Sequence, residues 1–392
     1  MSLPRMYTLG SSPLFLLVSH EIAKLSEHPK SIPNLILLLS DPLKLKRFLN
    51  NDSRISIGGN NEPTFQYMAA CTPPALVTED KVIIDNLVVV EKNKQKLLTD
   101  LNQYKGSLKG KSNVLLINPP MGIFEMLWDS IWKENERQLM PNIFVGLTDK
   151  DEAIVTSNRS PNNPNLILNS NNNLVKRNRE FSVNLNPMYW NSKIRLLVTR
   201  APNQFDVTKS PTSTLLLNQL TKNNDLTGVM NKLDRFNTSY IEFTDFQFLR
   251  LERTIIDGCV ESLAALYDCK YIHELLIVKN VDHLLRTLIR EQIYVTIRSY
   301  PHLIQSTNCN VILSEDRIFE LIMMKLKDLK VKSKAFKYMN RLDIHSINDL
   351  NSYFIDLGYK NKIYCKWNIM LNSLLKGKTT IKKESSTANT YM

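Results

Sequence analysis

Short apolar runs alternate with helical patterns along the first 150 residues of this chain. Each run is a few residues long and is bounded by Gly, Pro, Asn or Ser, which favours a buried strand over a buried helix. Strands that alternate with helices pair in parallel and are covered by helices on both faces. The pattern therefore predicts an α/β domain with a doubly wound sheet. The expected strands are Met6–Gly10, Asn34–Leu39, Asn86–Val90, Ser112–Ile117 and Pro141–Leu147.

From Thr244 onward the pattern changes, and apolar residues recur at helical spacing almost to the end of the chain. The periodic segments are 245–269, 281–299, 315–329 and 346–357. No alternation typical of strands interrupts them. The second part of the chain is therefore predicted to be an all-α domain.

These two patterns define the expected domain organisation. An α/β domain over residues 1–200 precedes a helical domain over residues 238–375. Within the first domain, residues 149–186 are rich in Asn, Ser and Pro, which indicates either a flexible insertion or an irregular β excursion. Residues 376–392 are predicted to be a disordered tail.

Composition narrows the classes of function. With 392 residues, of which 43% are hydrophobic, the chain can bury a sizeable core. No apolar run approaches the roughly 18 to 20 residues that a membrane-spanning helix needs, so a membrane contact would be peripheral. Five scattered cysteines, without a Cys-x-x-Cys pair or a histidine at ligand spacing, predict no metal site and a reducing compartment. A formal charge of +12 fits a polyanionic partner, and it fits a basic soluble protein without one equally well.

The first expected strand ends at a glycine turn. Strand, glycine and helix in this order open a Rossmann-like dinucleotide-binding domain, where the backbone approaches a pyrophosphate. Here Gly10 is kept, but Ser12 and Phe15 stand at the second and third glycine positions. Asp41 follows the second strand and could bind a ribose diol, although an aspartate before proline is more often a turn or a helix N-cap. The candidate cofactor-binding residues, Gly10, Ser11, Ser12 and Asp41, thus match the pattern poorly.

The order of the two domains and several local strings resemble the ketopantoate reductase family over nearly the whole chain. Beside the glycine turn, the strings are Leu116-Ile117-Asn118 followed by Gly122, Gly146-Leu147-Thr148, Arg253–Tyr267 and His345–Tyr353. The resemblance implies a Rossmann-like domain followed by a helical domain similar to the C-terminal domain of 6-phosphogluconate dehydrogenase. It also implies an NAD(P)-dependent reductase or a protein that senses the dinucleotide.

At the catalytic positions of that family this chain differs. Arg253 stands where the family has a proton-donating lysine, and an arginine is a poor general acid because it keeps its proton. Asp257 and Glu261 replace two asparagines and put negative charge where a carboxylate substrate would bind. Ser346 replaces a glutamate, and only Asn118 keeps the family's residue type. The resemblance therefore implies a reductase frame without catalytic residues. An ion pair between Arg253 and Asp257 along the helix and a plain turn at Asn118 are the structural alternatives.

Three further strings resemble the budding-yeast mitochondrial translational activators of cytochrome b, which are related to ketopantoate reductases. They are Phe48–Ser53, Met68–Pro74 and Leu115–Pro119. This resemblance implies a non-catalytic activator of the cytochrome b messenger that acts through its 5′ untranslated leader, the mitochondrial ribosome and other translational activators. It also implies a matrix protein attached peripherally to the inner membrane. Because Pro4 and Arg5 lead straight into the first strand, an internal import signal is expected.

RNA contacts are not assigned by any RNP, KH or zinc-knuckle signature. The densest basic cluster is followed by aromatic residues, which together can bind phosphates and stack on bases. A solvated helix face explains the same lysines equally well. The candidate RNA or ribosome contacts are Lys325, Lys327, Lys330, Lys332, Lys334 and Arg341.

Overall fold

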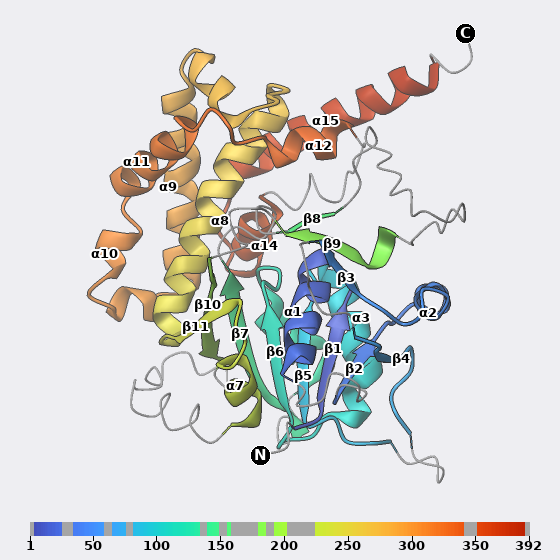
Figure 1. Cartoon of the computed structure of the whole chain (residues 1–392). Coiled ribbons are helices and arrows are strands. Elements are labelled where there is room, and N and C mark those ends of the chain that lie inside the picture. The colour runs from blue at the N-terminus through green and yellow to red at the C-terminus, as the bar shows by residue number, and fades with distance from the viewer. Residues whose placement is uncertain are drawn as a thin grey trace. The chain divides into compact units, whose positions relative to one another are not determined.

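The computed structural model describes residues 4–25, 34–58, 65–75, 81–133, 139–148, 155–157, 179–185, 192–201, 224–340 and 351–388. The chain forms two compact units, Met1–Phe243 and Thr244–Met392. Every strand of the described residues lies in the first unit, and the second unit is helical (Figure 1). The predicted order of a parallel α/β domain followed by a helical domain is confirmed.

An eight-stranded sheet forms the core of the first unit. Its strands are β1 (Met6–Gly10), β2 (Leu35–Leu38), β4 (Met68–Ala70), β5 (Asn86–Val90), β6 (Asn113–Ile117), β7 (Asn142–Thr148), β10 (Ile194–Arg200) and β11 (Phe236–Tyr240). Their order is β11-β10-β7-β6-β5-β1-β2-β4, and only β10 and β7 pair antiparallel. Because β1 lies between β2 and β5 in parallel register, the carboxyl ends of these three strands meet at one edge. That edge is where open α/β sheets bind ligands.

Helices cover both faces of this sheet. They are α1 (Pro13–Lys24), α2 (Pro42–Leu49), α3 (Lys94–Tyr104), α4 (Ile123–Met126) and α7 (Asp225–Met230). Val88 and Val90 of β5 belong to one buried cluster with residues of α1 and α7, and α1 crosses in front of the strands in Figure 1. Leu87 and Val89 point to the opposite face because side chains alternate along a strand, and both are buried too. Such strands are typical of a parallel sheet covered on both sides.

A small sheet packs beside α1. It consists of β3 (Ser56–Gly58), β8 (Val155–Ser157) and β9 (Ser182–Leu185), in the order β3-β9-β8. Phe181 and Val183 join the buried cluster that contains α1, and the Phe181 ring meets the edge of Phe48 at 4.9 Å between centroids. Part of the predicted Asn-rich insertion at 149–186 is thus regular β structure. The rest of that segment lies outside the described residues.

The second unit is built from helices. The helices are α8 (Phe243–Leu266), α9 (Val281–Ser299), α10 (Cys309–Ile312), α11 (Glu315–Leu326), α12 (Lys334–Asn340), α14 (Ser352–Lys360) and α15 (Lys366–Ala388), with 3-10 turns at Ile272–Ile277 and Pro301–Gln305. Of these, α11, α14 and α15 pack on α9. α9 covers the predicted segment 281–299. Because α7 and β11 belong to the first unit, that unit extends to Phe243 and not to the predicted limit at residue 200.

The predicted disordered tail at residues 376–392 needs correction, because α15 runs through most of it. The Lys378 ammonium donates to the carbonyl oxygen of Ala265 at 2.9 Å and to that of Leu266, at the end of α8. It also lies 2.8 Å from the carboxylate of Asp268. The last carbonyl groups of a helix have no partners within their own helix. Lys378, which in the sequence looks like a solvated charge of a disordered tail, therefore holds α15 against the end of α8.

Candidate functional site

The glycine turn after β1 has a geometric cause. Gly10 has a φ of +157°, and a Cβ atom at this position would lie 2.5 Å from the carbonyl oxygen of Val90 and 3.2 Å from Phe15 Cβ. Real Cβ atoms do not approach a backbone oxygen so closely, so only glycine fits. Gly10 is therefore required for the packing of β1 against β5 and α1, whether or not a phosphate binds there.

Both serines of the turn are hydrogen-bonded within the first unit. Ser12 is the N-cap of α1, and its Oγ accepts the N–H of Phe15 at 3.2 Å. Ser11 Oγ donates to Glu91 Oε2 at 2.8 Å. Phe15, at the third glycine position, is fully buried. The turn thus uses side chains where a dinucleotide site uses glycines to let the pyrophosphate approach the backbone.

The Glu91 carboxylate lies at the point where the carboxyl ends of β1 and β5 meet. Its Oε1 accepts the backbone N–H groups of Lys92 and Asn93 at 3.0 and 3.1 Å. Its Oε2 accepts the Ser11 hydroxyl and the Lys96 ammonium, both at 2.8 Å. Burial alone would raise the pKa of Glu91, but the hydrogen bonds from Lys96, Asn93 and Ser11 hold it below its ordinary value. An internal anion thus lies beside the glycine turn and accepts the Ser11 hydroxyl together with two backbone N–H groups and the Lys96 ammonium.

Charges of both signs surround Glu91. Lys96 also lies 4.0 Å from Asp100, and burial raises the pKa of Asp100. Lys44 on α2 is close enough for the charges of Lys96 and Glu91 to act on it, and burial together with Lys96 lowers its pKa to about 8. The lysines at this edge are thus matched by acids of the same unit. A pyrophosphate here would add negative charge to a cluster that is already balanced.

Asp41 serves as a helix cap. Its side chain accepts the N–H of Leu43 at 2.8 Å and forms the N-cap of α2. Arg47 of the same helix lies 4.0 Å from Asp41 and 3.1 Å from Glu180, which belongs to the turn before β9. The N-cap alternative is the arrangement that Asp41 adopts in this structure.

Asn118 links two strand ends. It has a left-handed φ of 47° directly after β6. Its amide nitrogen donates to Thr148 Oγ1 at 2.7 Å, and its amide oxygen accepts the Thr148 N–H at 2.8 Å. These two bonds join the end of β6 to the end of β7. The one position that keeps the reductase residue type therefore has a local structural role, as the turn alternative expected.

Arg253, Asp257 and Glu261 follow one another on α8 at intervals of one turn. The Asp257 carboxylate lies 2.5 Å from the ammonium of Lys325 on α11 and 3.7 Å from that of Lys334 on α12. Burial would raise the pKa of Asp257, but Lys325, Lys334 and Arg253 hold it below its ordinary value. The ion pairs of Asp257 with Lys325 and Lys334 join α8 to α11 and α12.

Glu261 anchors the start of α12. Its side chain is 2% exposed, and its Oε2 accepts the Ser333 hydroxyl and the Ala335 N–H, both at 3.0 Å. Burial raises the pKa of Glu261 despite these two bonds. A carboxyl group enclosed in this way holds a helix end and is inaccessible to a substrate.

The predicted basic cluster divides into two groups. Lys325 and Lys334 hold Asp257, as described above. Lys327, Lys330 and Lys332 are exposed. The remaining predicted site residues, Arg341 and Ser346, lie outside the described residues.

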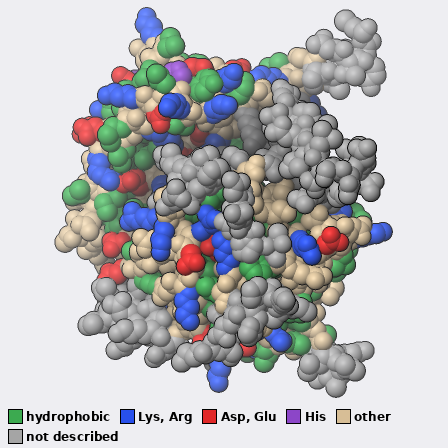
Figure 2. All heavy atoms as spheres, in the orientation of Figure 1, with side chains coloured by type: hydrophobic (Ala, Val, Ile, Leu, Met, Phe, Trp, Pro, Cys, Tyr) green, Lys and Arg blue, Asp and Glu red, His purple; other side chains and the backbone are tan. Residues whose placement is uncertain are grey.

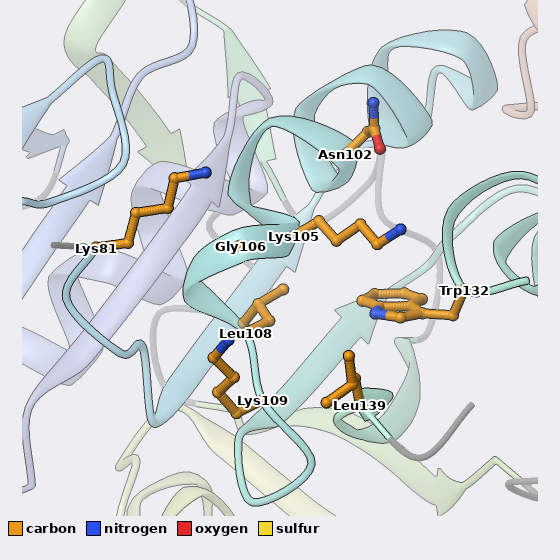
Figure 3. A pocket seen from close by; sticks show the side chains of 8 residues that line it. All are labelled: Lys81, Asn102, Lys105, Gly106, Leu108, Lys109, Trp132 and Leu139. Carbon is orange, nitrogen blue, oxygen red and sulfur yellow. The ribbon is translucent and has the colours of Figure 1, made fainter. Parts of the chain in front are cut away.

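A hollow of about 330 Å³ opens at the other edge of the sheet, near the amino ends of β5 and β6 (Figure 3). The side chains of Lys81, Lys105, Lys109 and Asn102 surround it, and the Trp132 ring forms an apolar wall. None of the predicted cofactor-binding residues lines this hollow. The hollow and the glycine turn are therefore separate features of the first unit.

Glu91 was missed by the sequence prediction. A signal for Glu91 exists, because it is an acid directly after a buried strand whose carboxyl end faces the glycine turn. Lys96 follows in the first turn of the next helix, where it can reach back to that carboxylate. Such a residue can be found in the sequence by its position just after a predicted strand, in addition to its residue type.

All five cysteines are free thiols. Within the described ranges, no group of three or more His, Cys, Asp or Glu residues could hold a metal ion. In the same ranges, no helix is both long enough and apolar enough to cross a bilayer.

Residues 245–379 match the family described as ketopantoate reductase PanE/ApbA C terminal. Over 100% of its length this chain is 33% identical to the cytochrome B translational activator CBS2 of Saccharomyces cerevisiae, 99% of which is covered. Its fold is similar to the putative 2-dehydropantoate 2-reductase of Enterococcus faecalis, with a TM-score of 0.60 and 14% identity over 96% of this chain and 98% of that one. The probable 2-dehydropantoate 2-reductase PanE of Bacillus subtilis gives a TM-score of 0.54 and 13% identity, over 95% and 99% of the two chains. At these identities the solved structures show a shared fold.

Proposed function

Because this chain belongs to the family of the cytochrome b translational activator CBS2, we propose that it activates translation of the mitochondrial cytochrome b messenger. It acts through the 5′ untranslated leader, with the mitochondrial ribosome and other translational activators. The observation that carries the proposal is the 33% identity over 100% of this chain and 99% of its relative. The reductase fold does not carry it, because one fold supports many functions.

The state of the former catalytic positions supports a role without catalysis. Reduction of a keto group needs a proton donor, and Arg253 is a poor one. Asp257 and Glu261 hold α11 and α12, and the negative charge of Asp257 would repel a substrate carboxylate. In the first unit, the Glu91 carboxylate puts a negative charge beside the glycine turn, which disfavours a dinucleotide phosphate there. We infer that the reductase frame persists as a scaffold for binding.

The proposal includes a place and a contact surface. By kinship the protein acts in the mitochondrial matrix, in peripheral contact with the inner membrane. Lys327, Lys330 and Lys332 are the exposed part of the predicted basic cluster and are proposed to meet RNA or the ribosome. On the face drawn in Figure 2, basic and acidic side chains are intermingled, so a local cluster is a better candidate there than a broad basic surface.

The decisive experiment is radiolabelling of mitochondrial translation products in cells that lack this chain, with the cytochrome b messenger measured in parallel. We expect cytochrome b synthesis alone to fail while its messenger persists. A chimeric messenger with the leader of another mitochondrial gene should restore synthesis. Normal labelling of all products in the deletion strain would refute the proposal.

The similarity to reductases supports one alternative, an NAD(P)-dependent reductase or dinucleotide sensor. Purified full-length protein, mixed with NADH or NADPH and a panel of 2-keto acids, should give no turnover above the rate without protein. Steady oxidation of either dinucleotide would favour the enzyme. Saturable dinucleotide binding without turnover would favour the sensor.

A further inference from the structure

One face of α15 exposes large apolar side chains. Trp367, Met370, Leu374 and Ile381 are 37%, 44%, 49% and 67% exposed. At 100° per residue these four positions fall within about 60° of one another around the helix axis. They form a row along the helix, which we call the α15 stripe. Exposed single apolar residues are ordinary, but a row of them along one helix marks an interaction surface.

The α15 stripe is not the face that packs within the second unit. Leu371, Leu375 and Thr379 are buried, at 4%, 0% and 1% exposure. Their mean direction lies about 110° around the helix from that of the stripe. The helix α15 therefore has two apolar faces. One is buried within the second unit, and the other, the α15 stripe, is in contact with solvent.

Every charged side chain of the segment that carries this stripe is positive, and the nearby acids belong to other elements: Glu291 of α9 accepts the N–H groups of Trp367 and Asn368 at 2.9 and 2.8 Å. Between Leu357 and Lys383 the sequence has no acidic residue, and it has seven lysines: Lys360, Lys362, Lys366, Lys376, Lys378, Lys382 and Lys383. Lys378 and Lys382 are paired with Asp268 of the α8 end, at 2.8 and 2.5 Å. The others include Lys360, Lys362 and Lys366 at the start of the stripe, all of them exposed.

Aromatic side chains extend the stripe toward α14. Tyr359 and Tyr364 are 72% and 77% exposed. The Lys366 ammonium lies 4.8 Å from the centroid of the Trp367 ring. Tyrosine and tryptophan with neighbouring lysines are the residues that lie at the boundary between lipid head groups and acyl chains.

We propose that the α15 stripe docks on the surface of a bilayer that contains anionic lipids. The stripe enters the head-group region, and the flanking lysines bind lipid phosphates. The aliphatic members Met370, Leu374 and Ile381 favour lipid over RNA, because RNA bases stack on aromatic rings and do not stack on aliphatic side chains. The absence of acids from Leu357 to Lys383 favours an anionic surface over a mixed protein surface. This inference rests on the peripheral membrane contact of the proposed function and assigns residues to it.

The test is flotation of the full-length protein with vesicles. Vesicles of phosphatidylcholine with one-fifth cardiolipin are compared with vesicles of phosphatidylcholine alone. We expect the protein to float with the first and not with the second. The double variant Leu374→Ser, Ile381→Ser should bind at least roughly tenfold more weakly, since these two side chains are the most exposed of the stripe, at 49% and 67%. The matched control, Ile304→Ser with Val311→Ser, alters side chains that are 57% and 63% exposed elsewhere in the unit and should float normally.

Each contrary outcome overturns the proposal. Failure of the wild-type chain to float with cardiolipin vesicles removes the lipid surface as partner. Equal flotation of the stripe variant and the control variant removes the stripe. A stripe variant that floats normally but loses binding to the cytochrome b leader assigns the surface to RNA. Deletion of the gene tests the proposed function separately, because normal cytochrome b synthesis in the deletion strain would refute it whatever the vesicles show.

Discussion

The glycine turn of the first unit and the acidic face of α8 in the second unit have both departed from a reductase, but in different ways. At the turn, an internal carboxylate, Glu91, accepts backbone N–H groups and the Lys96 ammonium. On α8, the acids are attachments for neighbouring helices, with Asp257 bound to Lys325 and Glu261 to Ala335. The first arrangement fills one position with a single side chain, whereas the second is part of the packing between helices.

This difference predicts how reversible each loss is. A covered site can be opened by removing the group that fills it, because the donors around Glu91 are held by strand ends and a helix start. A face converted into structural contacts cannot be opened without loss of packing, because Glu261 is 2% exposed. Substitution of Glu91 should therefore create binding of an anion, whereas substitution of Glu261 should lower the stability of the second unit.

The largest expected effect is at Glu261. Replacement by Ala leaves the Ser333 hydroxyl and the Ala335 N–H without their acceptor in a buried place and creates a cavity. We expect a loss of about 3 kcal/mol in the free energy of unfolding, measured by chemical denaturation. The control Glu320→Ala changes an exposed acid of the same unit and should cost little. If both variants unfold alike, Glu261 is not a structural attachment.

Gly10→Ala should have the next largest effect. The added Cβ meets the carbonyl oxygen of Val90 at 2.5 Å, so β1, β5 or α1 must shift. We expect a loss of about 2 kcal/mol in the free energy of unfolding, seen as a lower Tm. Gly228→Ala is the matched control, because a Cβ at that helical position meets nothing within 4 Å. This control should be neutral or slightly stabilising. Equal tolerance of both changes would mean that Gly10 is not held by packing.

Glu91→Ala should open the covered site. Removal of the carboxylate leaves the N–H groups of Lys92 and Asn93 and the Lys96 ammonium directed at one vacant position. We expect ADP to bind at least roughly tenfold more tightly than to the wild-type chain, measured by calorimetry. Glu91→Gln keeps the position filled and should show no gain. A variant Glu91→Ala that binds no better would show that the turn has lost its anion site altogether.

The sequence predicted the parallel sheet and the helical second unit well, because apolar periodicity reports burial directly. It also identified the residues that differ from a reductase, since residue type alone decides whether Arg253 can donate a proton. It did not predict what those residues contact. The partners of Asp257 are 68 and 77 positions away along the chain, at Lys325 and Lys334. The tail was predicted as disordered because its lysines look solvated, and the carbonyl groups that bind Lys378 become visible only after folding.

The smallest expected effect is at Lys325, the partner of Asp257. Asp257 is 46% exposed at its side chain, so solvent weakens the pair, and Lys325→Ala should cost only about 0.5 kcal/mol in the free energy of unfolding at neutral pH. The pKa of Asp257 is lowered in the folded chain, so the contribution of the pair is present above the ordinary carboxyl pKa and is lost as pH falls through the lowered value. The difference between wild type and variant should therefore vanish in acid. Lys327→Ala, at an exposed neighbour, should show no such dependence. A difference that persists at low pH would mean that Lys325 stabilises α8 through packing of its side chain and not through its charge.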